Sequence, residues 1–244
     1  MKIKHLYLIQ GPYKESYTVN NVIKKSPDRK SIIGVFKENP NKDTIDLRNT
    51  FWYSGRNKLL EHAIKKYDFE YLHFLDDDLT FEFGDLDLYE DMIEKYKPLI
   101  ASPLHEIGDF TYFLKEKENY KEVEYADFMD PGFNTFSKNV LEKVFPYDGE
   151  FDHLCAYLSG YFLTLKMKEL KFSVFTNCAV KNVEHRAYTK GDRFFGNLTK
   201  EEYNKYNKHL NLSKKLPHYF CKNNKDKFFD SREVIKHILK KYCN

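Results

Sequence analysis

The chain has 244 residues and a formal net charge of +3 at pH 7, with 41% hydrophobic and 17% aromatic residues. This length suffices to bury the core of one α/β domain, so no second domain is required. The small net charge and the sequence pI of about 8.4 argue against a dedicated nucleic-acid-binding protein. The four cysteines are widely spaced without a C-x-x-C pair, which indicates neither a zinc ribbon nor a redox motif.

The N-terminal stretch predicts a β-α-β unit. An apolar strand over His5–Gln10 ends at Gly11 and Pro12, a helix follows around Val19–Lys25, and a second strand spans Ser31–Phe36. Neither G-x-G-x-x-G nor G-x-x-x-x-G-K-[ST] occurs, so no dinucleotide fingerprint or phosphate loop is supported. The apolar core at the N-terminus is too short for a signal peptide, and no apolar run reaches membrane-spanning length. We therefore expect a cytoplasmic protein with reduced thiols.

The prediction for the rest of the chain depends on the stretch Tyr71–Phe83. A helical pattern over Trp52–Tyr67 leads into an apolar strand, Tyr71–Leu75, which stops at three consecutive aspartates, Asp76–Asp78. In open α/β sheets, ligands bind at the carboxyl ends of strands, and adjacent carboxylates repel unless a cation or a proton offsets them. A divalent metal is the simplest explanation, and a solvated Asp-rich turn is the alternative.

The spacing of the aspartates favours a D-x-D pair. Side chains alternate along an extended chain, so Asp76 and Asp78 are expected on one side and Asp77 on the other. Hard oxygen ligands suit magnesium, manganese or calcium, and magnesium keeps coordination positions for substrate phosphates. The predicted metal therefore bridges carboxylate and diphosphate.

Further helices and strands are predicted downstream. Leu86, Tyr89, Ile93 and Tyr96 share one face of a helix, and Ser137 can cap a short helix that follows a glycine turn and a strand. The mixture of aromatic and charged residues over Asp109–Met129 favours a hairpin or edge strands. Other strands are expected over Leu99–Leu104, Phe172–Thr176 and Val180–Val183.

The succession Ser54-Gly55-Arg56-Asn57, helix, apolar strand and D-x-D resembles the GT-A class of nucleotide-sugar-dependent glycosyltransferases. The resemblance covers roughly Lys2–Arg193. It implies one Rossmann-like α/β domain with a mixed, mostly parallel central sheet and helices on both faces. Residues 1–105 would form its nucleotide-sugar half and residues 106–198 its acceptor half.

The resemblance also implies a set of donor-binding residues. Asp78 and His185 would hold Mn2+ or Mg2+, with Asp76 contacting metal-bound water or ribose. Tyr13 could stack on the base or simply pack, and Arg56 could reach the diphosphate or be an ordinary surface arginine. The base or ribose carboxylate would be Asp43 or Asp46, and either could equally be a solvated loop residue. The basic residues that follow His185 would cover the diphosphate as a flap: Arg186, Lys190 and Arg193.

On the acceptor side the sequence departs from the family pattern. Many inverting members carry an acidic pair at the start of the late helix, where this chain has Ser159 and Gly160. Asp152 is the nearest acidic candidate for the general base, with His153 beside it as a substitute; the alternative is that Asp152 only caps the helix. The other acidic candidates for the general base are Asp130, Asp148 and Glu150.

Charge is unevenly distributed between the middle of the chain and its C-terminus. Residues 67–131 contain 19 acidic and 5 basic residues, whereas residues 200–244 contain 12 basic and 5 acidic ones. We expect residues 199–244 to form a basic helical extension packed on the domain. Its stripe over Val234–Tyr242 could instead lie on an anionic membrane, where lipid-linked acceptors would be found.

The sequence therefore predicts a metal-dependent, inverting glycosyltransferase that uses a nucleotide-diphosphate sugar and a glycan or lipid-linked acceptor. Two alternatives stay open. Asp76–Thr80 spells the D-x-D-x-T of haloacid-dehalogenase-type phosphohydrolases, in which Asp76 would be the nucleophile. The aromatic content and the basic tail also suit a non-enzymatic carbohydrate- or nucleic-acid-binding module.

Overall fold

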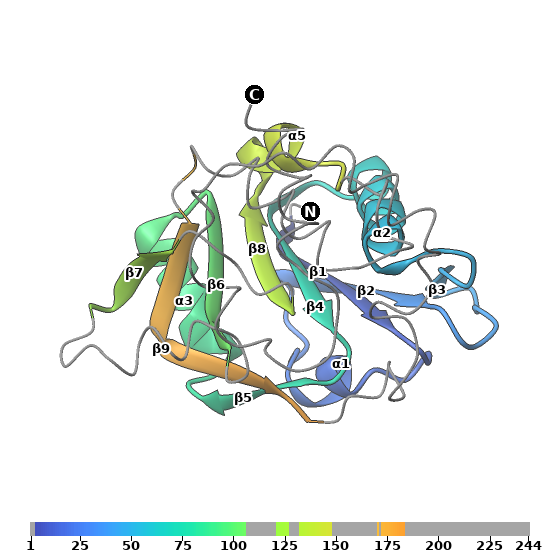
Figure 1. The fold of residues 1–244 in the computed structure, drawn as a ribbon, viewed down its shortest axis with the longest axis horizontal. Helices are drawn as coiled ribbons and strands as arrows, with labels where there is room; N and C mark the ends of the chain where they lie inside the picture. The colour runs from blue at the N-terminus through green and yellow to red at the C-terminus, as the bar shows by residue number, and fades with distance from the viewer. Residues whose placement is uncertain (1–2, 106–120, 127–131, 148–169, 171, 184–244) are drawn as a thin grey trace, which may run out of the picture.

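The computed structural model describes residues 3–105, 121–126, 132–147, 170 and 172–183, most of which form or flank one mixed sheet. The sheet has nine strands in the order β3-β2-β1-β4-β8-β6-β9-β5, with β7 also paired to β9 (Figure 1). The strands are β1 (Ile3–Gly11), β2 (Arg29–Val35), β3 (Thr44–Asp46), β4 (Phe69–Asp76), β5 (Leu79–Phe83), β6 (Ile100–His105), β7 (Val123–Ala126), β8 (Phe133–Ser137) and β9 (Phe172–Asn182).

Strand direction follows from the pairings. The pairs β1–β2, β1–β4, β2–β3 and β6–β9 are parallel, whereas β4–β8, β6–β8, β5–β9 and β7–β9 are antiparallel. Strands β1, β2, β3, β4, β6 and β9 therefore run one way, and β5, β7 and β8 run the other way. This confirms the predicted mixed sheet in which most strands are parallel.

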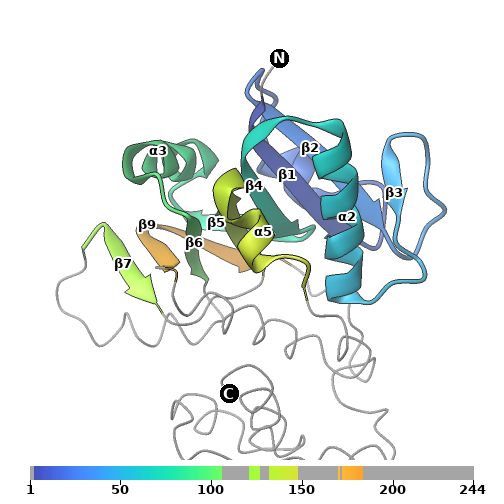
Figure 2. The same cartoon turned by 90° about the horizontal axis from the view of Figure 1, so that it is seen from above.

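Side-chain alternation along the central strands divides the core into two layers. In β1, Leu6 and Leu8 join a cluster that includes residues of α2 (Trp52–Lys66) and α5 (Leu141–Val144). Tyr7 and Ile9 point into the other cluster, which includes residues of α3 (Leu86–Tyr96) and lies beside α1 (Tyr17–Asn21). Helices therefore cover both faces of the sheet, as the sequence predicted, and Figure 2 shows α2 and α3 well apart.

The helix boundaries have local causes. The Asp85 carboxylate accepts a hydrogen bond from the Leu88 N–H at 2.8 Å and so caps α3, which ends at Lys97 in the left-handed region with φ 44°. Ser137 precedes the 3-10 turn η1 (Lys138–Val140) as predicted, but its side chain makes no capping hydrogen bond there. None of the helices among the described residues is long and apolar enough to cross a membrane.

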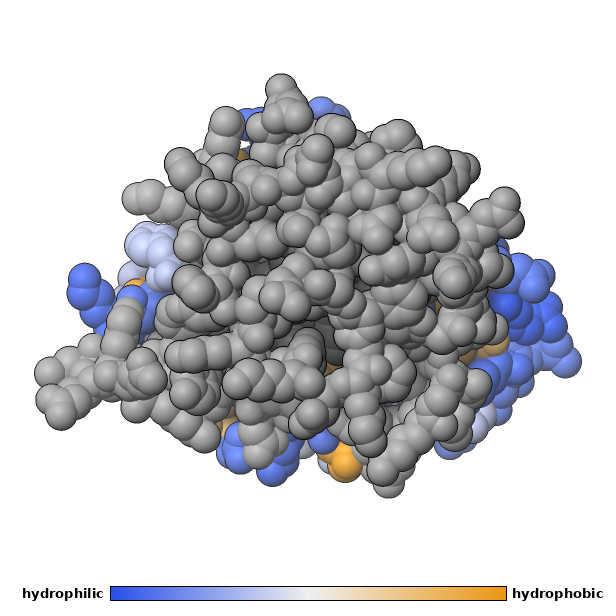
Figure 3. Space-filling view, viewed as in Figure 1, coloured by the Kyte–Doolittle hydropathy of each residue, from blue (hydrophilic) through white to orange (hydrophobic). Residues whose placement is uncertain are grey.

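Three strands differ from the prediction. The expected strands Phe172–Thr176 and Val180–Val183 are one strand, β9, whose register with β6 shifts between Pro103 and Leu104. Strands β3 and β5 were not predicted from the sequence, and β5 begins directly after the aspartates. The polar loops around β3 form the hydrophilic surface at the right of Figure 3.

A buried chain of hydrogen bonds crosses the centre of the sheet. His5 Nδ1 of β1 lies 3.0 Å from His73 Nε2 of β4, and His73 Nδ1 lies 2.8 Å from Thr135 Oγ1 of β8. The Thr135 hydroxyl also lies 2.8 Å from the Tyr89 hydroxyl of α3. At the outer end, His5 Nε2 lies 3.8 Å from a carboxylate oxygen of Glu94, which is partly exposed.

Burial controls the charge of the two imidazoles in this chain of contacts. It lowers the pKa of His5 and lowers that of His73 well below its ordinary value. A neutral imidazole donates from one ring nitrogen and accepts at the other, so each histidine can be a donor to one neighbour and an acceptor from the next.

We predict that the protein loses stability as the pH falls below about 6.5, the ordinary pKa of histidine. In that pH range the unfolded chain binds protons that the folded chain does not bind. Burial of His73, together with the neighbouring His5 and Arg29, disfavours its charged form in the folded state. Above this pH the histidines are neutral in both states, so their contribution to the free energy of unfolding is fully present. The melting temperature should drop by at least a few degrees between pH 7 and pH 5.

The variant His73→Gln should have a flatter pH profile, measured by circular dichroism. The matched control is His62→Gln, which replaces a partly exposed histidine of α2 and should keep the wild-type profile. A wild-type profile in His73→Gln would contradict this account.

Candidate functional site

The candidate site lies where the order of the strands across the sheet reverses, between β1 and β4. From β1 the chain continues into β2 on one side, and it returns to place β4 on the other side of β1. Gln10 at the end of β1 is the register partner of Asp76 at the end of β4. In open α/β sheets, ligands bind outside the carboxyl ends of strands at such a switch point.

The three aspartates form a turn, which we name the carboxylate turn (Asp76–Asp78). Strand β4 ends at Asp76, and β5 begins at Leu79. The expectation that side chains alternate through Asp78 was therefore wrong in its premise, because the extended backbone ends at Asp76. The Asp76 side chain is 26% exposed, whereas Asp77 and Asp78 are buried.

Thr18 of α1 holds the backbone of the carboxylate turn. Its N–H donates to the Asp77 carbonyl at 2.9 Å, and its hydroxyl donates to the Asp76 carbonyl at 2.9 Å. The same hydroxyl oxygen accepts the Leu79 N–H at 2.9 Å. Thr18 is fully buried, where unpaired polar groups are costly. Its hydroxyl pairs with the Asp76 carbonyl before the turn and with the Leu79 N–H after it.

Gly11 allows the end of β1 to approach the turn closely. A Cβ atom at this position would lie 2.5 Å from Asp77 Cγ and 2.6 Å from Asp77 Cβ. Any larger residue would displace the Asp77 side chain or the strand end. The contact fixes the separation between β1 and the carboxylate turn.

Arg56 of α2 holds the Asp76 side chain. Its Nη2 donates to Asp76 Oδ1 at 3.1 Å, and its guanidinium carbon lies 3.7 Å from the Trp52 ring centroid and 5.1 Å from that of Phe74. The Arg56 side chain is fully buried. The alternative that Arg56 is an ordinary surface arginine is therefore wrong.

The end of β9 holds Asp78. Asn182 Nδ2 donates to Asp78 Oδ1 at 2.7 Å, and the Val183 N–H donates to the Asp78 carbonyl at 2.7 Å. Val183 is the last described residue of this segment. The predicted ligand His185 lies outside the described residues, and its backbone follows Val183 by two positions.

Asn57 of α2 holds Tyr147, which belongs to the predicted acceptor half, residues 106–198. Its Nδ2 donates to the Tyr147 carbonyl at 2.9 Å, and its Oδ1 accepts the Tyr147 N–H at 2.8 Å. The Tyr147 ring packs 4.7 Å from the Tyr53 ring and 5.8 Å from the Phe74 ring. Burial raises the pKa of Tyr147 to about 12, partly offset by the adjacent Arg56.

Other predicted donor residues lie at the surface. Tyr13 follows β1 and is 42% exposed, so it is accessible to a ligand. Asp46 receives two hydrogen bonds from the Arg48 guanidinium, at 2.9 and 2.8 Å, which lower its pKa. Asp43 is exposed. The arrangement favours an ordinary loop ion pair for Asp46, and the roles predicted for Tyr13 and Asp43 stay predictions.

Several predicted residues lie outside the part of the chain that the structure describes. They are the proposed general base and its alternatives, together with the basic flap: Asp130, Asp148, Glu150, Asp152, His153, Arg186, Lys190 and Arg193. The boundary predicted at residue 198 and the C-terminal extension also lie outside it. These assignments stay predictions.

The chemistry of the carboxylate turn suits a hard divalent cation. Asp76 and Asp78 supply carboxylate oxygens, the ligands that magnesium and manganese prefer, and each carboxylate can accept up to about four hydrogen bonds or metal contacts. Within the described ranges no group of three or more His, Cys, Asp or Glu side chains could hold a metal. A complete site would therefore need a further ligand, the place predicted for His185.

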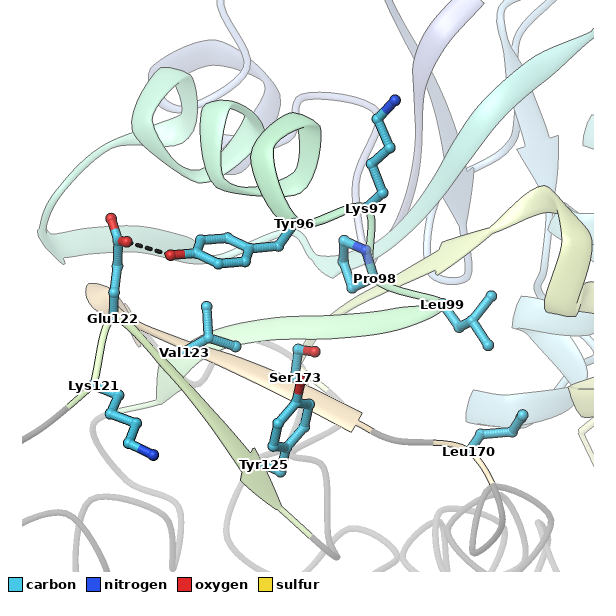
Figure 4. Close-up of a pocket in the computed structure, with 10 residues that line it drawn as sticks. All are labelled: Tyr96, Lys97, Pro98, Leu99, Lys121, Glu122, Val123, Tyr125, Leu170 and Ser173. Atoms are coloured by element: carbon cyan, nitrogen blue, oxygen red, sulfur yellow. Dashed lines mark hydrogen bonds between the residues drawn. The ribbon is translucent and has the colours of Figure 1, made fainter.

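A separate pocket of about 620 Å3 lies at the amino-terminal ends of β6 and β9 (Figure 4). It is bounded by the end of α3, the amino-terminal ends of β6 and β9, and β7. Tyr96 borders it and donates a hydrogen bond to Glu122. The remaining lining residues are Lys97, Pro98, Leu99, Lys121, Val123, Tyr125, Leu170 and Ser173.

The comparisons with known proteins concern the fold. No protein-family model and no curated protein sequence matches this chain. A solved structure of GalNAc-T7 with UDP, GalNAc and Mn2+ is similar, with a TM-score of 0.58 and 11% identity over 99% of this chain. A structure of TarS from S. aureus has a TM-score of 0.51 and 12% identity over 75% of this chain.

This chain covers 55% of the GalNAc-T7 chain and 37% of the TarS chain. At such low identity the likeness establishes the fold alone. The described residues adopt the GT-A type of α/β fold, which confirms the fold predicted from the sequence.

We predict that Thr18→Val destabilises the protein by about 1–3 kcal/mol, because it removes the hydroxyl that serves Asp76 and Leu79 without changing side-chain volume. Chemical denaturation measures this. Thr18→Ser is the matched control, since it keeps the hydroxyl, and should retain most of the stability. Equal stability of Thr18→Val and the wild type would show that the hydroxyl does not hold the turn.

Proposed function

We propose that the protein is a metal-dependent glycosyltransferase that moves a sugar from a nucleotide-diphosphate sugar to an acceptor hydroxyl. The observation that carries the proposal is the carboxylate turn at the switch point of a GT-A-type sheet. Fold alone does not define activity, so the assignment depends on this site. The UDP and Mn2+ in the similar GalNAc-T7 structure support a nucleotide donor and a divalent cation.

In this proposal Asp78 and His185 hold the cation, and Asp76 contacts ribose or metal-bound water. The bond from Asn182 fixes the Asp78 carboxylate at its Oδ1 atom. His185 follows Val183 by two positions in the sequence, and the Val183 N–H donates to the Asp78 carbonyl. A divalent cation there would offset the charge that develops on the departing nucleotide diphosphate.

Tyr147 belongs to the acceptor half proposed for residues 106–198, and Asn57 holds it against α2. Asp152 follows Tyr147 by five positions in the sequence. We assign Asp152 as the base that takes the proton from the acceptor hydroxyl in an inverting transfer, with His153 as its substitute. The exposed Tyr13 would contact the donor base, and Arg186, Lys190 and Arg193 would cover the diphosphate.

The phosphohydrolase alternative requires Asp76 as a nucleophile. Here the Asp76 carboxylate accepts a hydrogen bond from Arg56, and its strand is flanked by β1 and β8 in a GT-A-type sheet. These features favour the glycosyltransferase proposal. Formation of an aspartyl-phosphate would favour the phosphohydrolase.

We predict that Asp78→Ala and His185→Ala each weaken manganese-dependent nucleotide-sugar binding by tenfold or more, because each removes a proposed metal ligand. Isothermal titration calorimetry with and without a chelator measures this. The exposed Asp91 of α3 provides a control, and Asp91→Ala should bind like the wild type. Full binding and turnover by chelator-treated protein would refute the metal assignment.

We predict that Asp152→Asn keeps the melting temperature and donor binding while turnover falls by about 10² or more, because asparagine cannot take up the proton. Asparagine still caps a helix, so the substitution separates the base from a cap. Steady-state kinetics and the anomeric configuration of the product test the assignment. Near-normal turnover, or a product with retained configuration, would remove Asp152 from this role.

A further inference from the structure

Arg56 has an unusual environment for a charged side chain. Its neighbours on the same face of α2, Tyr53, Leu59 and Leu60, belong to the apolar core, and Arg56 is as buried as they are. The guanidinium lies between the rings of Trp52 and Phe74, at 3.7 and 5.1 Å from their centroids. Stacking on aromatic faces partly offsets the loss of hydration.

A buried charge requires a partner, and for Arg56 that partner is Asp76. One N–H, from Nη2, reaches Asp76 Oδ1 at 3.1 Å. Among the described residues, Nε and Nη1 have no hydrogen-bond acceptor. Removing one member of a buried ion pair leaves the other uncompensated, which is strongly destabilising. The pair therefore ties the α2 helix to the last residue of β4.

The two members of the pair differ in access to a ligand. Arg56 is fully buried, so its guanidinium is closed to a diphosphate that approaches from solvent, whereas the Asp76 side chain is 26% exposed. A ligand that approaches from solvent therefore meets the carboxylate and not the guanidinium. The adjacent positive charge also lowers the attraction of Asp76 for a second cation, which leaves a neutral hydroxyl as the better partner.

We propose that Arg56 is a positioning residue: it fixes the Asp76 carboxylate and offsets its charge, so that Asp76 accepts a hydrogen bond from a ribose hydroxyl of the donor. Arg56 then makes no contact with the diphosphate, which replaces the role suggested by the sequence pattern. This inference rests on the proposed nucleotide donor. It divides the carboxylate turn into a hydroxyl acceptor, Asp76, and a metal ligand, Asp78.

The test compares binding of UDP and of uridine, which shares the ribose but lacks the diphosphate. In Arg56→Leu, both affinities should fall by the same factor, about tenfold, the loss of one hydrogen bond to a charged group. Arg56→Lys keeps the charge and should bind both probes better than Arg56→Leu. Titration calorimetry measures UDP, and saturation-transfer NMR measures uridine. Mn2+ alone should bind Arg56→Leu at least as tightly as the wild type.

A double-mutant cycle with Asp76→Asn separates positioning from a general loss of stability. If Arg56 acts through Asp76, the double variant should bind uridine no more weakly than the weaker single variant. Arg29 is the matched control, because it is also largely buried and paired, with Glu90 and Asp87. Arg29→Leu should lower the melting temperature without changing the uridine affinity.

The outcomes are distinguishable. A selective loss of UDP affinity in Arg56→Leu, with uridine affinity unchanged, would show a direct diphosphate contact and overturn the inference alone. Additive losses in the cycle would also overturn it. If the wild type bound neither UDP nor uridine with Mn2+ present, the inference would be overturned, whereas turnover of a nucleotide-diphosphate sugar with another base would retain the proposed function. If Arg56→Leu does not fold, the same comparison in Arg56→Lys decides between the two roles.

Discussion

The parallel pairing of β1 with β4 is the constraint on which the candidate site depends. It places Gln10 opposite Asp76, and it puts the reversal of strand order at the point where the aspartates emerge. The close approach of Gly11 to Asp77 allows the two strand ends to lie side by side. Because β4 is also paired with β8, the strand that delivers the carboxylates is held on both edges.

Three consecutive carboxyl groups are accommodated here because each has its own environment. Asp76 pairs with a buried guanidinium, Asp77 packs against the end of β1, and Asp78 accepts a hydrogen bond from Asn182. These partners come from α2, β1 and β9, which are far apart in the sequence. A turn held by contacts from several elements is constrained at several atoms, and a site that positions a ligand requires such support.

Much of this could be predicted from the sequence, because the strongest patterns are local. The helix before the aspartates, the apolar strand β4 and the mixed sheet with helices on both faces all follow from periodicity and the family resemblance. The contacts of Thr18 and Asn182 were missed. Each lies more than 50 positions from the aspartates it contacts, and a single threonine or asparagine gives no local signal.

The turn at Asp77 was misread for a similar reason. A run of aspartates is compatible with an extended chain, and only the contact with α1 shows that the backbone turns there. The burial of Arg56 was equally hidden, since an arginine at the start of a helix is usually exposed. Tertiary contacts determine the positions of such polar residues, so local propensity does not predict them.

The most direct test of the central claim is the position of manganese in crystals grown with Mn2+ and UDP, located by anomalous diffraction. The account predicts one strong peak within about 2.5 Å of an Asp78 carboxylate oxygen, bridging to the diphosphate. Bound UDP with no peak at the carboxylate turn, or a peak at another place in the protein, would contradict it.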